Sequence, residues 1–414
     1  MSRSGDNPGD GRFVVSDGNF ALFAALILAA TSIIRIGACL YLPAIPVIGE
    51  DLGLDKAQMG LTITAYFAFF AVSAVVAGPV SDTIGRRVPI LLGILVFISG
   101  SVMCASADGF PLLLGGRIAQ AIGAGMIPGT ARAMARDAAG DVHFVSIMGW
   151  MAVLGGTLLV AAPILGGVIT QYLGWRSNFW ILSGVAVASF AAVAWGLRET
   201  LPRASRHPLS LVPIMKSYWE MAFSKRFTWV LLPVALSFSF QGVYLAMASF
   251  VFIKEFGFTP LEFGLANIVI VAGLFAGRRI SVFCERGISA SAGYRAGGAA
   301  LIAGGAVFAA IPLFPSLENP WTLLGALFLF ALGFGTVSPL GMKATITAFR
   351  RRGGAAAALQ GFILLGATGL GGAAASYAMR SFGGHSVASL FSVCAALVVS
   401  ATGLAAFATA KSVE

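Results

Sequence analysis

Charge is scarce in this sequence, and its absence from long stretches decides the class of protein. Charged residues make up 11% of the 414 residues, hydrophobic residues make up 58%, and the mean hydropathy is +0.89. An average soluble domain has about 25% charged residues, so this composition excludes an ordinary soluble fold. Apolar stretches of about 20 residues, long enough to span a bilayer as a helix, recur along the whole chain. An integral membrane protein is therefore indicated.

Cysteine is also scarce, and its spacing excludes several kinds of site. The 4 cysteines lie in or beside apolar stretches, and no two of them form a Cys-x-x-Cys pair. Neither a disulfide framework nor a metal site is indicated, so we expect no metal and no cofactor. The 3 histidines lie in loops or at helix ends. The sequence also contains no nucleophile–base pair or phosphate-binding loop, so we expect no enzymatic activity.

The apolar stretches predict an all-α integral membrane fold of twelve transmembrane helices in two pseudo-symmetric six-helix bundles. The first bundle is predicted to contain helices at 20–42, 57–80, 88–107, 111–134, 144–170 and 178–197. The second bundle is predicted to contain helices at 228–253, 263–283, 294–314, 321–342, 355–379 and 386–408. Several of these helices contain Pro or Gly in the middle, which membrane helices tolerate when neighbouring helices satisfy the backbone.

A short repeat and one long connection divide the chain into two halves. The run Ala121–Gly125 recurs as Ala331–Gly335, and a proline follows each run. Duplicated halves of this kind place a substrate cavity at their interface near the bilayer midplane. We predict a cytoplasmic tail at 1–19, an N-terminal bundle at 20–197, a cytoplasmic linker at 198–227, a C-terminal bundle at 228–408 and a tail at 409–414.

The positive charge falls on one side of this arrangement. With both termini on the same side, that side receives most of the 27 Lys and Arg residues; the exceptions are Lys56, Arg176, Lys254 and Arg380 in outer loops, and Arg35 and Arg117 within the membrane. The positive-inside rule then places both termini in the cytoplasm and explains the net charge of +10 without nucleic acid. We expect a monomeric multi-pass protein of a bacterial inner membrane, surrounded by lipid.

A basic turn at residues 78–87 joins the second and third predicted helices. Gly78 and Gly85 permit a tight, closely packed turn because glycine tolerates unusual backbone angles. Arg86 and Arg87 are predicted to anchor the turn at the cytoplasmic face. The turn is therefore a candidate part of a conformational gate on that face.

Asp82 within this turn is predicted to need a partner. It lies near a helix C-terminus, where the helix dipole disfavours an anion. We expect the partner to be the N-terminus of the eleventh predicted helix, near residues 353–354, or one of the two basic residues Arg132 and Arg136.

The fifth predicted helix carries a face of small residues that lets another helix approach closely. Pro163, Gly166 and Gly167 lie on this face and are further gate candidates. We expect its partner to be the eighth predicted helix, through Gly264, Gly273, Ala276 and Gly277.

Together these motifs resemble those of the drug:proton antiporter branch of the major facilitator superfamily, and within it the Bcr/CflA/MdfA-like group. The resemblance covers essentially the whole chain, through residues 41–46, 65–66, 78–87, 116–121, 136–137, 163–167, 174–176 and 199–202. One departure within these motifs is Ala162, where the fifth-helix motif usually has Gly. The resemblance implies a secondary active transporter that moves small molecules by alternating access, with protons as the coupling ion.

The chain departs from that group where the group carries its membrane acids. The resemblance places a first-helix acid at the position of Cys39 and a second acid at the position of Thr31. None of the twelve predicted helices contains Asp or Glu. Arg35 and Arg117 lie there instead, and a charge at mid-membrane costs about 2.5–3.5 kcal/mol on insertion scales, so it usually marks a substrate or ion path.

These two arginines lead the list of candidate site residues. Arg35 shares one helical stripe with Ser32 and Cys39, so we expect it to face the cavity; the alternative is that it snorkels to the outer interface. By resemblance, Arg117 is the fourth-helix arginine that couples protonation to substrate. The remaining candidates for substrate binding, for which helix packing is the alternative, are Thr31, Cys39, Tyr66, Gln120, Gln241, Tyr244 and Gln360.

Two arginines without a buried carboxylate predict an electropositive cavity and a substrate with a carboxylate or phosphate group. We therefore predict proton-coupled efflux of small molecules, drug-like or anionic, across the inner membrane. The alternative is an importer or exchanger of organic anions without proton antiport. A membrane sensor or membrane enzyme is a third class, and the sequence gives it little support.

Overall fold

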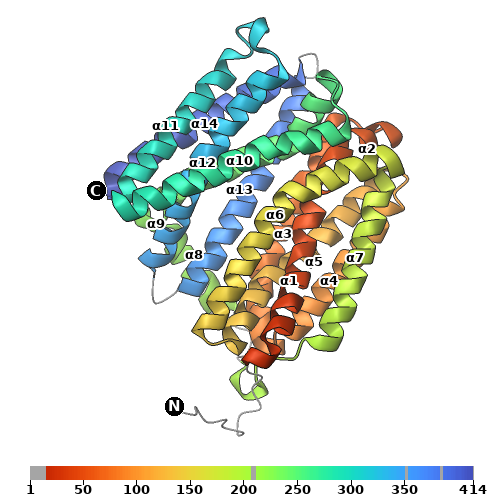
Figure 1. Ribbon diagram of the computed structural model, residues 1–414, viewed down its shortest axis with the longest axis vertical. Coiled ribbons are helices and arrows are strands. Elements are labelled where there is room, and N and C mark those ends of the chain that lie inside the picture. Colours follow the sequence, from red (N-terminus) through yellow and green to blue (C-terminus); the bar gives the residue numbers. More distant parts are fainter. Residues whose placement is uncertain (1–14, 207–210, 350–352, 383–385, 414) are drawn as a thin grey trace.

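The computed structural model describes residues 15–206, 211–349, 353–382 and 386–413, and these residues form helices and connecting loops without a strand (Figure 1). The first half contains α1 (Asp17–Cys39), η1 (Leu42–Ala44), α2 (Ile45–Asp51), α3 (Lys56–Ile84), α4 (Arg87–Ala105), α5 (Phe110–Ala138), α6 (Asp141–Leu173) and α7 (Trp175–Gly196). The second half contains α9 (Lys225–Ser249), η3 (Phe250–Glu255), α10 (Pro260–Gly287), α11 (Ala290–Ala310), η4 (Pro315–Leu317), α12 (Pro320–Ala348), α13 (Gly353–Ser381) and α14 (Val387–Val413).

Within the described ranges, 11 helices are long and apolar enough to cross a membrane. The remaining predicted membrane helix is α11, which is built mainly of Ala and Gly and packs against α12 and α14. Small side chains lower its mean hydropathy but allow its neighbours to approach closely. The predicted all-α integral membrane fold is confirmed.

Two segments differ from the predicted helices. The first membrane helix ends at Cys39 rather than at Leu42, because Pro43 disfavours the α conformation of the residue before it and cannot donate a backbone hydrogen bond. The chain continues there as η1 and the short helix α2. The linker between the halves also contains η2 (Arg203–Ser205) and the helix α8 (Leu211–Ala222), which is too short to be found by a search for membrane spans.

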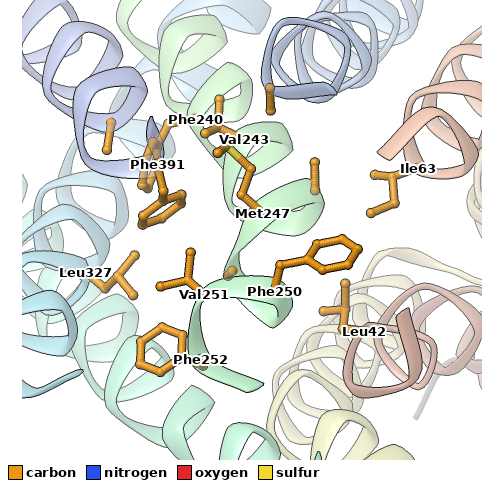
Figure 2. Packing of buried hydrophobic residues seen from close by; sticks show 14 of the residues in the cluster. Leu42, Ile63, Phe240, Val243, Met247, Phe250, Val251, Phe252, Leu327 and Phe391 are labelled. Atoms are coloured by element: carbon orange, nitrogen blue, oxygen red, sulfur yellow. The ribbon is translucent and has the colours of Figure 1, made fainter. Parts of the chain in front are cut away.

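The two halves converge at the end of the molecule that carries α2 and diverge toward the end that carries the chain termini (Figure 1). We refer to these as the closed end and the terminal end. At the closed end, Leu42 and Ile63 of the first half belong to one buried apolar cluster with Met247, Phe250 and Val251 of the second half (Figure 2). An ion pair between Lys254 and Glu50 joins the halves at the rim of this cluster.

The helix α9 changes to a π-helix, η3, at the closed end. A π-helix turn is wider than an α-helix turn and often marks a functional site. Here it carries Phe250, Val251 and Lys254, which form the apolar and charged contacts between the halves. This irregular segment therefore supplies much of the closed end.

Glycines bring the halves together along α6 and α10. A Cβ at Gly167 would clash with the backbone oxygen of Pro260 in the second half, whereas one at Gly166 would clash with that of Leu40 in the first half. Gly264 of α10 lies similarly against Pro163. The predicted packing of α6 on α10 is confirmed for Gly264 but is wrong for Gly273 and Gly277, which pack instead against the backbone of α12.

A close contact between α9 and α13 tests the packing within the second half. A Cβ at Gly242 of α9 would clash with the backbone oxygen of Thr368 in α13, and backbone atoms cannot move aside without separating the helices. We expect Gly242→Ala to destabilise the protein by about 1–3 kcal/mol through overpacking, measured as a lower melting temperature in detergent. The control is Gly184→Ala, where no atom lies within 4 Å of the added Cβ. Equal melting temperatures for the two variants would contradict the packing described here.

Candidate functional site

A cavity of about 590 Å³ lies between the two halves. Helices α1, α3, α5 and α6 line it from the first half, and α9, α10, α12 and α13 line it from the second half. Its lining residues within the described chain include no Asp, Glu or His. Its polar and charged lining residues are Thr31, Ser32, Arg35, Cys39, Arg132, Gln241, Tyr244, Asn267 and Thr368.

The polar stripe of α1 faces this cavity. Thr31, Ser32, Arg35 and Cys39 all line it. The two hydroxyl groups donate to carbonyls of their own helix, Thr31 Oγ1 to Ile27 O at 2.9 Å and Ser32 Oγ to Leu28 O at 2.7 Å. This local bonding leaves the guanidinium as the main hydrogen-bond donor on this wall.

Arg35 has no ion pair or hydrogen bond with any residue that the structure describes. Its side chain is exposed, whereas Cys39, one turn further along the helix, is buried. Residues four apart on a helix are neighbours, so an acid at position 39 would lie within reach of the guanidinium. Because position 39 holds a neutral thiol, the positive charge of Arg35 remains uncompensated in the cavity.

Arg117 is placed differently, inside the first half and beneath the cavity wall. It is 2% exposed, and its guanidinium carbon lies 4.3 Å from the ring centroid of Tyr41 and 4.3 Å from that of Tyr66. Its Nη1 donates to Gln120 Oε1 at 2.8 Å and lies 3.5 Å from Gly37 O. Two aromatic faces and neutral oxygens therefore stabilise this charge, in place of a carboxylate.

This arrangement brings three predicted site residues together without placing them in the cavity. Tyr66, Arg117 and Gln120 are all buried, and none of them lines the cavity. Gln120 Nε2 donates to Ser101 Oγ of α4 at 2.8 Å. The network thus connects α1, α3, α4 and α5, which suits a role in holding the first half rigid.

The second half contributes two predicted residues that do line the cavity, Gln241 and Tyr244 of α9. The Tyr244 hydroxyl donates to Asn267 Oδ1 at 2.7 Å, and Asn267 Nδ2 donates to Phe263 O at 2.8 Å. Gln360 lies elsewhere: it is buried within the second half and accepts a hydrogen bond from Thr345 Oγ1 at 3.0 Å.

An aromatic wall completes the cavity. Phe330 and Phe334 of α12 stack with a centroid distance of 5.7 Å and an interplanar angle of 8°. Phe238 meets Phe334 edge to face at 5.4 Å. The sequence did not identify Phe330 and Phe334 as cavity residues. A Phe in an apolar helix is expected to pack against other helices, and only the helices that face it show whether it lines a cavity.

Sequence reasoning also missed Arg132 as a cavity residue. It lies on α5 four residues after Pro128, and both residues line the cavity. The distribution of Lys and Arg along the chain had grouped Arg132 with the other basic residues predicted on the cytoplasmic side. Its spacing from Pro128, equal to one helical turn, was the available signal that the two share a face.

The basic turn at the terminal end is tied to the loop after α7. The carboxylate of Glu199 accepts from the backbone N–H of Arg86 at 2.9 Å and of Arg87 at 3.1 Å. It also accepts from the N–H groups of Thr200 and Leu201. Gly85 has a φ of 102°, and a Cβ there would clash with the Glu199 carboxylate, so only glycine fits.

Asp82 pairs with Arg86 at 2.5 Å. Among the described residues it has no ion pair or hydrogen bond with the N-terminus of α13, with Arg132 or with Arg136, which were its predicted partners. Arg86 Nε also donates to Asp137 Oδ2 at 2.9 Å, and Arg87 Nη2 donates to Ala194 O. The prediction overlooked Arg86 itself, which follows the end of α3 at Ile84 and lies only four residues after Asp82, within reach of its carboxylate. Gly78 is packed loosely, with no atom within 4 Å of an added Cβ.

Membrane helices in two halves around a polar central cavity define a membrane transporter. The sequence model of the Major Facilitator Superfamily matches residues 22–368, and the chain belongs to this family. The membership predicted from the motifs is thus confirmed.

Known relatives agree with this assignment. The chain is 29% identical over 230 residues to the multidrug resistance protein MdtL of Klebsiella pneumoniae (strain 342), a match that covers 56% of this chain and 58% of MdtL. It is 27% identical over 242 residues to the uncharacterized MFS-type transporter YdgK of Bacillus subtilis (strain 168), covering 57% of this chain and 60% of YdgK. The matches thus span less than two thirds of the length of these relatives.

A solved structure shows the same fold. A bacterial homolog of the human lysosomal transporter Spinster, in an inward-facing and unoccupied conformation, superposes with a TM-score of 0.73. The two chains are 16% identical, and the match covers 96% of each. At this identity the likeness concerns the fold alone.

Glu199 provides a test of the terminal turn. Burial raises its pKa, but the backbone hydrogen bonds to the carboxylate outweigh this effect and lower the pKa below its ordinary value. The carboxylate therefore stabilises the fold above the unfolded pKa of about 4.3, and this contribution is lost as the pH falls through the folded pKa. We expect Glu199→Gln to lower stability at pH 7 by about 1–3 kcal/mol, because its amide cannot accept all of these bonds.

The measurement is the melting temperature of the purified protein from pH 7 down to about pH 3, which reaches below the unfolded pKa. Wild type should lose stability toward the acid end more steeply than the variant. Parallel curves for the two proteins would show that the Glu199 carboxylate does not support the turn.

Proposed function

We propose that this protein exports small amphipathic organic anions across a bacterial inner membrane by alternating access. One observation carries the proposal: Arg35 lies without a partner in a cavity whose described lining contains no carboxylate. A guanidinium at this depth is costly unless something compensates its charge. A substrate carboxylate, phosphate or sulfonate can do so through paired hydrogen bonds.

The rest of the cavity suits an apolar body attached to that anionic group. The aromatic wall of Phe238, Phe330 and Phe334 offers ring faces and edges to a flat or apolar molecule. Gln241 and Tyr244 of α9 add polar groups from the second half. A volume of about 590 Å³ lies within the range of sites for drug-sized ligands.

Charge and the relatives support the proposed direction of transport. The basic terminal end faces the cytoplasm by the positive-inside rule, so the cavity of this structure is accessible from inside. A potential of 100 mV, negative inside, favours outward movement of a monoanion by about 2.3 kcal/mol. The multidrug resistance relative MdtL also supports export.

Alternating access requires the closed end to open while the terminal end closes. In this proposal the apolar contacts of Leu42 with Phe250 and the ion pair of Glu50 with Lys254 separate as the halves rock. Pro163 and Gly167 of α6 lie against Gly264 and Pro260 of α10 and provide close-packed backbone on which the two helices can pivot, while Gly166 holds α6 against Leu40 of its own half. We propose that a monomer performs this cycle within the lipid bilayer.

Protons are the proposed coupling ion, by analogy with the antiporter branch that the motifs resemble. The second candidate is exchange of organic anions without proton antiport. It is favoured by the cavity itself, whose described lining offers no acid or histidine to carry a proton.

The substitution Arg35→Gln tests the proposal. The probes are naphthalene-2-carboxylate, its neutral carboxamide and the cationic naphthylmethylammonium, which share an aromatic body and differ in charge. In energised everted vesicles, wild type should accumulate the carboxylate in preference to the other two. The variant should need about tenfold or more carboxylate for half-maximal uptake, because a charge-assisted hydrogen bond contributes about 1.5–3 kcal/mol. Arg35→Lys, which keeps the charge, should lose less.

The same vesicle assay distinguishes proton antiport from exchange of organic anions. Loss of carboxylate uptake when a protonophore removes the pH gradient at constant potential would support proton coupling. Persistent uptake that requires a second anion on the opposite side would support exchange. Uptake of the cation or the carboxamide by wild type, unchanged in Arg35→Gln, would refute the proposed substrate class.

Cys39→Asp is the reciprocal test. A carboxylate one turn from Arg35 would pair with the guanidinium and compensate its charge. We expect weaker binding of the carboxylate probe and stronger binding of the cationic probe, measured by calorimetry. Cys39→Asn serves as the size-matched control and should leave the preference for the anion in place. An unchanged preference in Cys39→Asp would contradict the role given to Arg35.

A further inference from the structure

Arg132 is the second cation in the lining of the cavity, and no proposed step has used it. Its side chain is exposed, and its Nε donates to Pro128 O of its own helix at 3.1 Å. The acids at the same end of α3 and α5 do not compensate it. Asp82 and Asp137 are both bound to Arg86 instead. Within the described chain, Arg132 therefore has no carboxylate partner.

The neighbouring residue Arg136 differs from Arg132 in its surroundings. Arg136 lies one turn further along α5, and its guanidinium carbon is 5.1 Å from the ring centroid of Phe144. It does not line the cavity. Two arginines on one helix thus have different surroundings, and only Arg132 borders the cavity.

The two cavity arginines lie at opposite ends of the cavity. Arg117 on α5 lies beside Gly37 of α1, two residues from Arg35. Arg132 follows fifteen residues later, which corresponds to about 22 Å along the helix axis toward the terminal end. Arg35 therefore marks the deep part of the cavity, and Arg132 marks its opening.

We infer that Arg132 is an entrance residue that captures the anionic group of the substrate before Arg35 binds it. The inference rests on the proposed function, because it assigns a second residue to the same anionic substrate class. A single sign of charge in a cleft with apolar walls raises the local concentration of the opposite charge and speeds its association. A charge at the rim of a site changes the association rate and its dependence on salt more than it changes the affinity.

The test is a stopped-flow measurement of naphthalene-2-carboxylate binding to the full-length protein in nanodiscs, at low and high salt. We expect Arg132→Gln to slow association by about threefold to tenfold at low salt and to flatten the salt dependence. The dissociation constant from calorimetry should change less than the association rate. Arg35→Gln should do the opposite, raising the dissociation constant while leaving the association rate near that of wild type.

Three controls isolate the charge. Arg132→Lys should restore fast association, because it keeps the positive charge. Arg136→Gln removes the same charge one turn away, outside the cavity, and should behave as wild type. The neutral carboxamide should associate with Arg132→Gln and wild type at equal rates, which also shows that the variant is folded.

Three other outcomes would contradict the entrance role, and the third of them would also contradict the proposed substrate class. If Arg35→Gln loses affinity while Arg132→Gln associates as wild type does, the entrance role is wrong and the proposed function stands. If Arg132→Gln loses as much affinity as Arg35→Gln with no change in association rate, both arginines belong to one site and the entrance role is again wrong. If wild type binds the carboxylate no better than the carboxamide, both the entrance role and the proposed substrate class fail.

Discussion

A bilayer offers no water to solvate a charge, so every polar group within it needs a partner in the protein or in a water-filled cavity. The backbone meets this requirement through helices, but the side chains of Arg35 and Arg117 cannot. The chain supplies a carboxylate to neither of them. Arg117 is stabilised by two tyrosine faces and by Gln120. Arg35 is stabilised by no side chain that the structure describes, and it faces the cavity.

The two arginines therefore differ in role: Arg117 stabilises the first half, whereas Arg35 is available to a substrate. The network around Arg117 connects four helices of the first half, so that half can move as a unit. At the terminal end, Glu199 binds the turn between α3 and α4 and joins it to the loop after α7. At the closed end, apolar packing and one ion pair join the halves. Rigid halves with a separable contact between them are what rocking around a central site requires.

The class of fold and the family could be predicted from the amino-acid sequence alone. Hydropathy and the distribution of Lys and Arg predict the membrane helices, because a helix must match the bilayer thickness wherever it lies in the protein. The motif residues predicted the superfamily, and the matching family model confirms it. The stripe of Ser32, Arg35 and Cys39 followed from helical periodicity alone, and the structure places all three in the cavity lining.

Which polar residues share the cavity depends on how the helices pack, and this could not be predicted from the sequence. Periodicity gives the face of one helix but not what that face meets, so Arg117, Tyr66 and Gln360 could not be distinguished from cavity residues such as Tyr244. The aromatic wall on α12 and the position of Arg132 depend on how the two halves diverge. The π-helix at Phe250–Glu255 and the pairing of Asp82 with Arg86 also depend on local helix geometry, which apolar composition does not encode.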